Sequence, residues 1–516
     1  MGFQKNQIVT VFIEDIGETG EGIGRIDGYT LFVKDAIIGD TVEAKLIKVK
    51  KSFAFARLEK IIKASPHRVE PPCPIHRQCG GCQIQAMSYD EQLRFKQRKV
   101  LNHLVRIGGF PEGQMKSVME PIVGMEEPEP ATRDKRNARG FGYRNKAQFP
   151  VGTDKEGNLI TGFYAGRTHQ IIPNTDCLLG SVVNKPILEA VLAFMRQEGI
   201  PAYDEVTGKG LVRHILIRVG RVTKEVMVCL IINGKKIKNE DGLVESLLHC
   251  LDREERVLES GKQKESAERA EYKAFVPHGN AADKNAAAAD FQVTHISLCV
   301  NTEKTNVIMG NEIRLLYGKP YIRDFIRELE FHISPLSFYQ VNPVQVEKLY
   351  GAALEFAALT GTETVWDLYC GIGTISLCLA RSAKQVYGVE IIPQAIEDAK
   401  ENAARNQITN AEFYVGKAEE VLPRYFEEEQ RAGRTPHADL IVVDPPRKGC
   451  EAACLETMLK MQPDRIVYIS CDSATLARDL KYLCAGGYEI KRVRAVDMFG
   501  MTGHVEAVVL MSRVKE

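Results

Sequence analysis

Two residues near the end of the chain have side chains and positions that suit catalysis. Cys471 follows an apolar run, residues 465–469, that predicts a strand, and it precedes a stretch with helical periodicity. A thiol at the end of a strand can act as a nucleophile, and the nearby helix N-terminus predicts a lowered pKa for it. The alternative is an inert buried cysteine, which is the commoner environment for this residue type.

The carboxylate of Glu506 is the candidate general base. It begins the final apolar run, so we expect it to be buried, and burial raises the pKa of a carboxyl group towards a value that suits proton transfer. Two other interpretations remain open. Glu506 could be the ion-pair partner of Arg447, and His504 could serve as the base instead.

A thiol and a base together suit methylation at carbon 5 of uracil. This carbon is a poor nucleophile towards a sulfonium methyl group. Addition of a thiolate to carbon 6 gives an enolate with carbanion character at carbon 5, which can then attack the methyl group. A base removes the proton from carbon 5 and the thiolate leaves. Methylation of an amine or a ring nitrogen needs no such nucleophile.

A glycine-rich loop between a predicted strand and a predicted helix indicates a cofactor site. The loop runs from Asp367 to Thr374 and contains Gly371 and Gly373, which let the backbone turn tightly beside a ligand. Glu390 ends the next predicted strand, where an acid can accept hydrogen bonds from ribose hydroxyls. Position 376 is Ser, so the third glycine of a dinucleotide fingerprint is missing. The pattern favours S-adenosylmethionine over a nicotinamide cofactor.

Asp444 follows a third predicted strand and stands directly before two prolines. The prolines restrict the backbone, which predicts that Asp444 is directed into a pocket at the carboxyl edge of the sheet. A rigid turn is the alternative. Adenine N6-methyltransferases have a similar loop that ends in an aromatic residue, whereas Arg447 stands here, which argues against amine methylation.

Three cysteines, Cys73, Cys79 and Cys82, lie close together in the sequence, and Cys177 is a remote fourth. Four thiolates can bind a tetrahedral zinc ion or an iron–sulfur cube, and the spacing leaves both open. A metal centre on these four cysteines would close a loop of about 100 residues, which predicts that it clamps distant segments of the chain together. A total of 13 cysteines in 516 residues is too few for a disulfide scaffold.

The elements around these residues predict three domains. Short alternating strands separated by glycines predict a small OB-like β-barrel in residues 1–66. A central domain of strands and helices is expected over 67–330, with a flexible insertion at 251–290. Strands alternating with helices predict a parallel, Rossmann-like α/β domain over 331–516.

The segment from Lys45 to Arg68 contains eight basic residues, one acid and two phenylalanines, Phe53 and Phe55. This composition suits a groove for single-stranded nucleic acid, and a solvated strand face is the alternative. Residues 88–105 predict a basic helix. The whole chain has 68 basic and 68 acidic residues, so its net charge does not indicate a partner. It has no apolar run of about 18 residues and no secretory signal pattern, so a cytoplasmic protein without membrane contact is expected.

Taken together, these motifs resemble a known family, the TRAM-containing ribosomal RNA uracil-5-methyltransferases (the RumA/RlmD group). The resemblance covers nearly the full length outside 251–290. The motifs that carry it are Cys73-x5-Cys79-x2-Cys82, Ser337–Asn342 (Ser-Phe-Tyr-Gln-Val-Asn), Asp367–Gly371, Asp444–Arg447, Ser470–Asp472 and Gly503–Glu506.

The resemblance implies several roles. It implies a class I methyltransferase domain, a TRAM barrel, and a [4Fe–4S] cluster on the cysteines, which are Cys73, Cys79, Cys82 and Cys177. It also implies a pocket for donor and uracil lined by Gln340, Tyr369, Glu390 and Asp444. Cys471 corresponds to the nucleophile and Glu506 to the base. Thr374 stands where several relatives have Asn, so a side-chain amide contact is expected to be missing.

The implied substrate is a uridine in 23S ribosomal RNA, modified before or during subunit assembly by a monomeric enzyme. Three alternatives remain. The first is an enzyme that acts on transfer RNA, and the second is a non-catalytic iron–sulfur protein that binds RNA. The third is an RNA cytosine-5 methyltransferase, in which catalytic cysteines typically follow Pro and Thr, whereas Cys471 follows Ser470.

Overall fold

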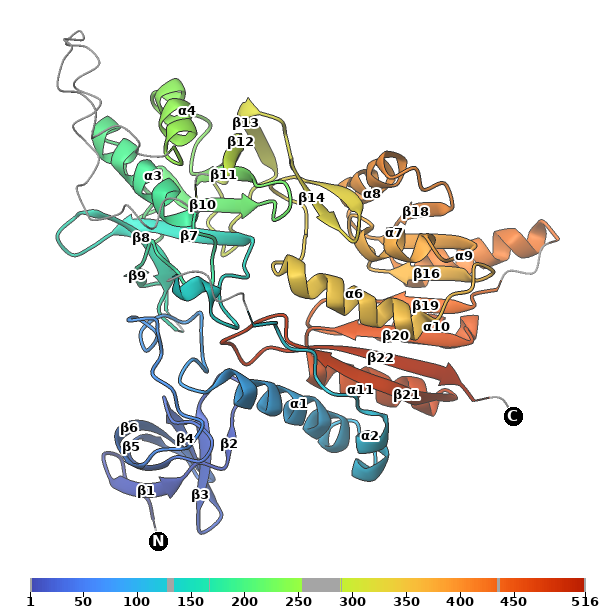
Figure 1. Cartoon of the computed structure of the whole chain (residues 1–516), viewed down its shortest axis with the longest axis horizontal. Helices are drawn as coiled ribbons and strands as arrows, with labels where there is room; N and C mark the ends of the chain where they lie inside the picture. Colours follow the sequence, from blue (N-terminus) through green and yellow to red (C-terminus); the bar gives the residue numbers. More distant parts are fainter. Residues whose placement is uncertain are drawn as a thin grey trace.

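The computed structural model describes residues 2–127, 134–166, 168–252, 288, 290–433 and 437–514. Most of the insertion expected at 251–290 lies outside the described residues. Within the described residues, no helix is both long and apolar enough to cross a membrane. Three large sheets and one hairpin organise the chain (Figure 1).

The first sheet is the small N-terminal β domain, coloured blue in Figure 1. Its strands follow the order β1-β5-β6-β4-β3-β2. They are β1 (Ile8–Phe12), β2 (Asp15–Ile16), β3 (Gly22–Ile26), β4 (Tyr29–Lys34), β5 (Thr41–Val49) and β6 (Phe53–Lys63). Alternate residues such as Leu31, Val33 and Ala54 are buried in its core, so their neighbours in the strands face outward.

The predicted basic helix is confirmed as α1 (Tyr89–Arg106), which is followed by the short α2 (Glu112–Val118). Helix α1 packs against α11 (Ser473–Ala485) of the C-terminal domain. The segment after α2 then runs beside β21 (Tyr488–Val496), where Met119 and Val123 form bridges with Val493 and Val496. The N-terminal third of the chain therefore contributes directly to the C-terminal fold.

The second sheet forms the centre of the molecule and has the order β13-β12-β11-β10-β7-β8-β9. Its strands are β7 (Lys146–Thr153), β8 (Leu159–Tyr164), β9 (Ile171–Pro173), β10 (Val212–Val219), β11 (Glu225–Ile232), β12 (Gln292–Val300) and β13 (Glu312–Gly318). Helices α3 (Asn184–Glu198) and α4 (Glu240–His249) cover one face through a shared apolar core (Figure 1). The hairpin of β14 (Ile322–Ile326) and β15 (Leu329–Ile333) leads to the C-terminal domain.

The third sheet confirms the predicted parallel α/β domain. Its order is β18-β17-β16-β19-β20-β22-β21, and only its last two strands are antiparallel to their neighbours. The strands are β16 (Thr364–Leu368), β17 (Gln385–Glu390), β18 (Ala411–Val415), β19 (Leu440–Val443), β20 (Arg465–Ser470), β21 and β22 (Glu506–Arg513). The other helices are α6 (Pro343–Ala357), α7 (Thr374–Ala380), α8 (Pro393–Arg405), α9 (Ala418–Arg431) and α10 (Ala452–Met461).

This wiring brings the predicted site residues to one edge. The carboxyl ends of parallel strands meet at the same edge of a sheet, so Tyr369, Glu390, Asp444 and Cys471 all follow strands there. Strand β22 runs in the opposite direction, so its first residue, Glu506, reaches the same edge.

Candidate active site

Cys471 and Glu506 face each other across two antiparallel strands. The register of β20 and β22 pairs Ser470 with Ala507, which places Cys471, one residue further on, opposite Glu506. The Glu506 carboxylate is close enough to raise the pKa of the Cys471 thiol electrostatically. Sheet register thus joins the two candidate catalytic groups, although 35 positions separate them in the sequence.

The predicted lowering of the Cys471 pKa was wrong. Burial, together with the neighbouring Glu506 and Asp444, raises the pKa of this thiol to about 12. The N-terminus of α11 does not offset this because Asp472 caps it. The Asp472 carboxylate accepts hydrogen bonds from the amides of Ala474 (2.9 Å) and Thr475 (3.2 Å). These two amides at the helix end are therefore already satisfied within the chain.

Glu506 is buried, with 3% of its surface exposed. Burial and the nearby Asp444 raise the pKa of its carboxyl group well above the usual value. Its Oε2 atom has no hydrogen-bond partner in the described part of the chain. Arg447 acts on it through charge alone, without an ion pair among the described residues. A buried carboxyl oxygen that lacks a partner is available for proton transfer.

His504 is less suited to act as a base. Burial and the cations Arg447 and Lys99 lower the pKa of its imidazole to about 4. The ring is therefore neutral at pH 7, and its low pKa makes it a weak proton acceptor. Of the two base candidates, Glu506 has the environment that favours proton uptake.

The glycine-rich loop after β16 has the strained backbone that a close ligand contact requires. Tyr369, Gly371 and Gly373 all have positive φ angles, at 70°, 54° and 81°. A tyrosine rarely adopts this conformation, so the surrounding packing must hold it there. The Glu390 carboxylate accepts a hydrogen bond from the Gly371 amide (3.3 Å) and keeps this turn beside the end of β17.

Beneath the loop, Asp367 is completely buried. Burial raises the pKa of its carboxyl group to about 7, although the hydroxyl of Ser376 donates a hydrogen bond to it. Position 376, which lacks the third fingerprint glycine, therefore supplies a hydroxyl that anchors the loop to α7. The sequence pattern did not indicate this role for Ser376.

Asp444 lies between the loop and the catalytic pair. Its amide donates a hydrogen bond to the carbonyl of Leu368 (3.5 Å) at the end of β16. Burial raises the pKa of its carboxyl group to about 7. Its charge in turn raises the pKa of Glu506, Cys471 and the Tyr350 hydroxyl. Asp444 is thus at the centre of a group of acids that compete for protons.

Gln340 lies on the connection between β15 and α6. The side chain of Asn145 donates a hydrogen bond to its carbonyl oxygen (3.1 Å), and the Asn342 side chain bonds the Met498 carbonyl (3.1 Å). This connection therefore joins the central sheet to the loop before Glu506. Phe338, on the same connection, is 71% exposed. It belongs to the Ser337–Asn342 motif, but its place in that motif did not indicate a role. An exposed ring of this kind can stack on a nucleobase.

The four cysteines of the predicted cluster come together from two distant segments. Cys82 and Cys177 pack against the same apolar cluster as Met501, and the charges of Cys73, Cys79 and Cys177 all act on Cys82. No three of these sulfur atoms, all within the described residues, lie within 4.8 Å of one another. The fold thus gathers the four thiols from two distant segments into one region.

Three phenylalanines of the N-terminal domain form one group. Phe32, Phe53 and Phe55 lie with ring centroids 5.4–5.7 Å apart on β4 and β6. Their neighbours Leu31 and Ala54 point into the core, so the three rings are on the outer face. Partly exposed rings on a basic strand suit base stacking.

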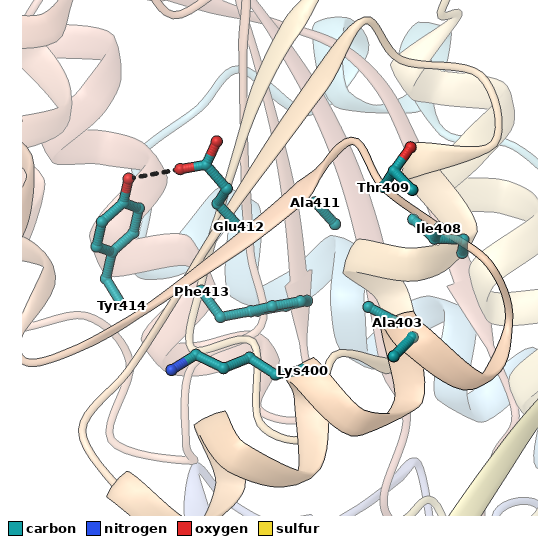
Figure 2. Close-up of a pocket in the computed structure, with 9 residues that line it drawn as sticks. Lys400, Ala403, Ile408, Thr409, Ala411, Glu412, Phe413 and Tyr414 are labelled. Atoms are coloured by element: carbon teal, nitrogen blue, oxygen red, sulfur yellow. Dashed lines mark hydrogen bonds between the residues drawn. The ribbon is translucent and has the colours of Figure 1, made fainter.

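A shallow hollow of about 480 Å³ lies elsewhere, between α8 and the edge strand β18. Figure 2 shows Phe413 and the stem of Lys400 side by side in it, with Glu412 bonded to Tyr414 at its rim. None of the predicted site residues lines this hollow. We therefore assign the chemistry to the edge that carries Cys471.

Comparisons with known proteins identify the family of this chain. Residues 278–514 match the family described as tRNA (Uracil-5-)-methyltransferase, and residues 2–58 match the TRAM domain. An uncharacterized RNA methyltransferase of Halalkalibacterium halodurans is 45% identical over 507 residues, which are 98% of this chain and 97% of the relative. One of Clostridium acetobutylicum is 42% identical over 511 residues, covering 99% and 98% of the two chains.

A solved structure is similar to this chain over nearly its whole length. The crystal structure of Pyrococcus abyssi tRNA (uracil-54, C5)-methyltransferase in complex with S-adenosyl-L-homocysteine superposes with a TM-score of 0.69 and 26% identity. It covers 98% of this chain and 100% of the archaeal chain. The similarity to relatives of 42% and 45% identity extends across nearly the whole sequence, and the chain therefore belongs to the family of S-adenosylmethionine-dependent RNA uracil-5-methyltransferases.

Proposed function

We propose that this enzyme methylates carbon 5 of a uridine in 23S ribosomal RNA through a covalent bond between Cys471 and carbon 6. The observation that carries the proposal is the position of Cys471 opposite Glu506, beside Asp444, at the edge of the sheet. Nucleophile, base and donor loop can then reach one pyrimidine ring.

S-adenosylmethionine supplies the methyl group on a sulfonium cation. Cys471 must lose its proton before it can attack, and its raised pKa opposes this in the free protein. A positive charge placed beside the three acids Cys471, Asp444 and Glu506 favours their ionised forms. A bound sulfonium would favour the thiolate in this way, and an ionised Asp444 would accept the thiol proton.

Glu506 then removes the proton from carbon 5 after methyl transfer, and the sulfur leaves carbon 6. The Oε2 atom of Glu506 supports this role, because no other described group donates a hydrogen bond to it and it is free to accept the proton. Glu390 would accept hydrogen bonds from the ribose hydroxyls of the methyl donor. Tyr369 and Asp444 would line the pocket for the donor. Gln340 would contact the uracil from the connection that also carries Phe338.

We further propose that Cys73, Cys79, Cys82 and Cys177 hold a [4Fe–4S] cluster. Their convergence from two distant segments supports a centre with four thiolate ligands, and the family resemblance favours the cube over a zinc ion. The cluster would clamp residues 67–330 as a central domain between a TRAM domain over 1–66 and a methyltransferase domain over 331–516.

A transfer RNA substrate is the second candidate, because the archaeal enzyme of similar structure modifies uracil 54 of tRNA. A deletion strain distinguishes the two. Loss of 5-methyluridine from 23S ribosomal RNA, with tRNA unchanged, supports the first proposal. Loss from tRNA alone would establish the second.

The covalent mechanism is tested with RNA that carries 5-fluorouridine, since fluorine cannot leave carbon 5 as a cation. We expect mass spectrometry to find RNA attached to the peptide that contains Cys471. Cys471→Ser should form no adduct, and Cys484→Ser, a half-buried cysteine on α11, should form it normally. An adduct in Cys471→Ser, or none in the unaltered enzyme, contradicts the mechanism.

A further inference from the structure

Two cations face each other in the central sheet without a carboxylate between them. The register of β7 and β10 places Lys146 directly opposite Arg218, so their side chains leave the same face of the sheet. On the other side, Arg218 pairs with Met227 of β11, which is apolar. Like charges in directly opposite positions destabilise a sheet.

Burial makes this pair more costly. Arg218 is 3% exposed, and its Nε atom has no partner among the described residues. Its guanidinium donates one hydrogen bond to the carbonyl of Ser337. Burial, with the charges of Arg218 and Arg144, lowers the pKa of Lys146 to about 7. In the described part of the chain, neither cation forms an ion pair with an acid.

The pair lies on the face of the sheet that α3 does not cover, with Lys146 at the start of β7. Ala147, Phe149 and their alternate neighbours pack under α3, so Lys146 and Gln148 lie on the opposite side of the sheet. Lys146 and Arg144 are both partly exposed there. Asn145, between them, holds the Gln340 carbonyl, so the cations lie beside the proposed uracil pocket.

We propose that Lys146 and Arg144, with Arg218 behind them, form a binding site for one backbone phosphate of the RNA substrate next to the target uridine. An anion there would neutralise the opposed cations, which explains why the fold keeps a pair that costs stability. This proposal rests on the proposed function, because the phosphate site would help to hold the RNA substrate of the same pocket.

The test uses the full-length protein and an RNA oligonucleotide that contains the target uridine. Lys146→Met keeps the aliphatic stem and removes the charge. We expect roughly tenfold weaker RNA binding, as for the loss of one charged hydrogen bond. The slope of log affinity against log salt should become shallower by about 0.7, the value for one phosphate on a single strand.

The same variant should have a higher Tm than the unaltered protein when RNA is absent, because the repulsion is removed. A lysine with a purely structural role would give a lower Tm instead. Lys146→Arg should keep both the affinity and the salt slope. Lys236→Gln, an exposed lysine beyond β11, is the matched control and should change neither quantity.

Equal salt slopes for the unaltered protein and Lys146→Met would overturn the proposal. Equal slopes combined with a Tm increase on addition of inorganic phosphate would assign the site to free phosphate rather than RNA, and would overturn it also. Methylation of the same oligonucleotide is measured in parallel. If the unaltered enzyme does not methylate it, the proposed function is refuted, whereas the salt slope tests only the phosphate site.

Discussion

Lys96 of α1 and Asp497 form a completely buried ion pair, with 2.6 Å between Nζ and Oδ1. Tyr89 also donates a hydrogen bond to Asp497 (2.6 Å), and Lys96 bonds the carbonyl of Phe499 (2.9 Å). Lys99, one turn further along α1, bonds the carbonyl of Gly503 (3.0 Å). Helix α1 therefore holds the loop that leads into Glu506, and the candidate base depends on a helix 400 residues away in the sequence.

Lys96→Met should destabilise the protein by about 3–5 kcal/mol, because it leaves the Asp497 carboxylate buried without its cation. Hydrogen exchange should rise most in residues 497–505. Denaturant unfolding of the full-length protein measures the loss of stability. Hydrogen-exchange mass spectrometry measures the faster exchange in the loop. The exposed Lys384→Met is the control. Unchanged exchange in this loop would show that α1 does not position it.

Glu506→Gln should accumulate the covalent adduct with ordinary RNA, because the sulfur cannot leave carbon 6 until the carbon 5 proton is removed. We expect turnover to fall by about 10²–10⁴-fold, the usual contribution of a general base. Denaturing gels of enzyme mixed with RNA and methyl donor measure the adduct. Glu428→Gln, on the exposed face of α9, should behave like the unaltered enzyme. Rapid turnover by Glu506→Gln would exclude Glu506 as the base.

Asp444→Asn should make stability less dependent on pH. The folded-state pKa of Asp444 is raised from 3.8 to about 7, so the folded protein holds this proton more tightly than the unfolded chain. That contribution is fully present below about pH 4 and is lost as the pH rises through about 7. The Tm of the unaltered protein should therefore fall more between pH 5 and 8 than that of Asp444→Asn.

Thermal unfolding across this range, without donor or RNA, measures the difference. Asp241→Asn, on the exposed end of α4, should keep the pH dependence of the unaltered protein. Parallel Tm curves for the unaltered protein and Asp444→Asn would mean that Asp444 is already ionised at pH 5.

Cys177→Ser should remove the proposed metal cluster, because the proposal makes Cys177 the fourth ligand and the one most distant in the sequence. Anaerobically purified protein should contain about four iron atoms per chain, and the variant much less. Elemental analysis for iron and zinc provides the measurement, and Cys484→Ser should retain the iron. One zinc and no iron in the unaltered protein would contradict the cluster. The Tm should fall in Cys177→Ser, since the clamp between residues 73–82 and 177 is lost.

The sequence alone determined the local features of this protein. Apolar runs and glycine positions predicted β16, β17, β19 and β20 with the loop after β16, because strand periodicity and turn residues depend on neighbours in the chain. The types and spacing of Cys471, Glu506 and the clustered cysteines indicated the chemistry in the same way.

Only the tertiary structure decided the environments of these groups. The pKa of Cys471 moved opposite to its prediction because the thiol is buried and because Glu506 and Asp444, which arrive through sheet packing, lie near the sulfur. The opposition of Lys146 and Arg218 depends on strand register, and the support of Glu506 by Lys96 depends on helix docking. Burial and charge proximity between distant segments arise when the chain packs, so a pattern of neighbouring residues does not contain them.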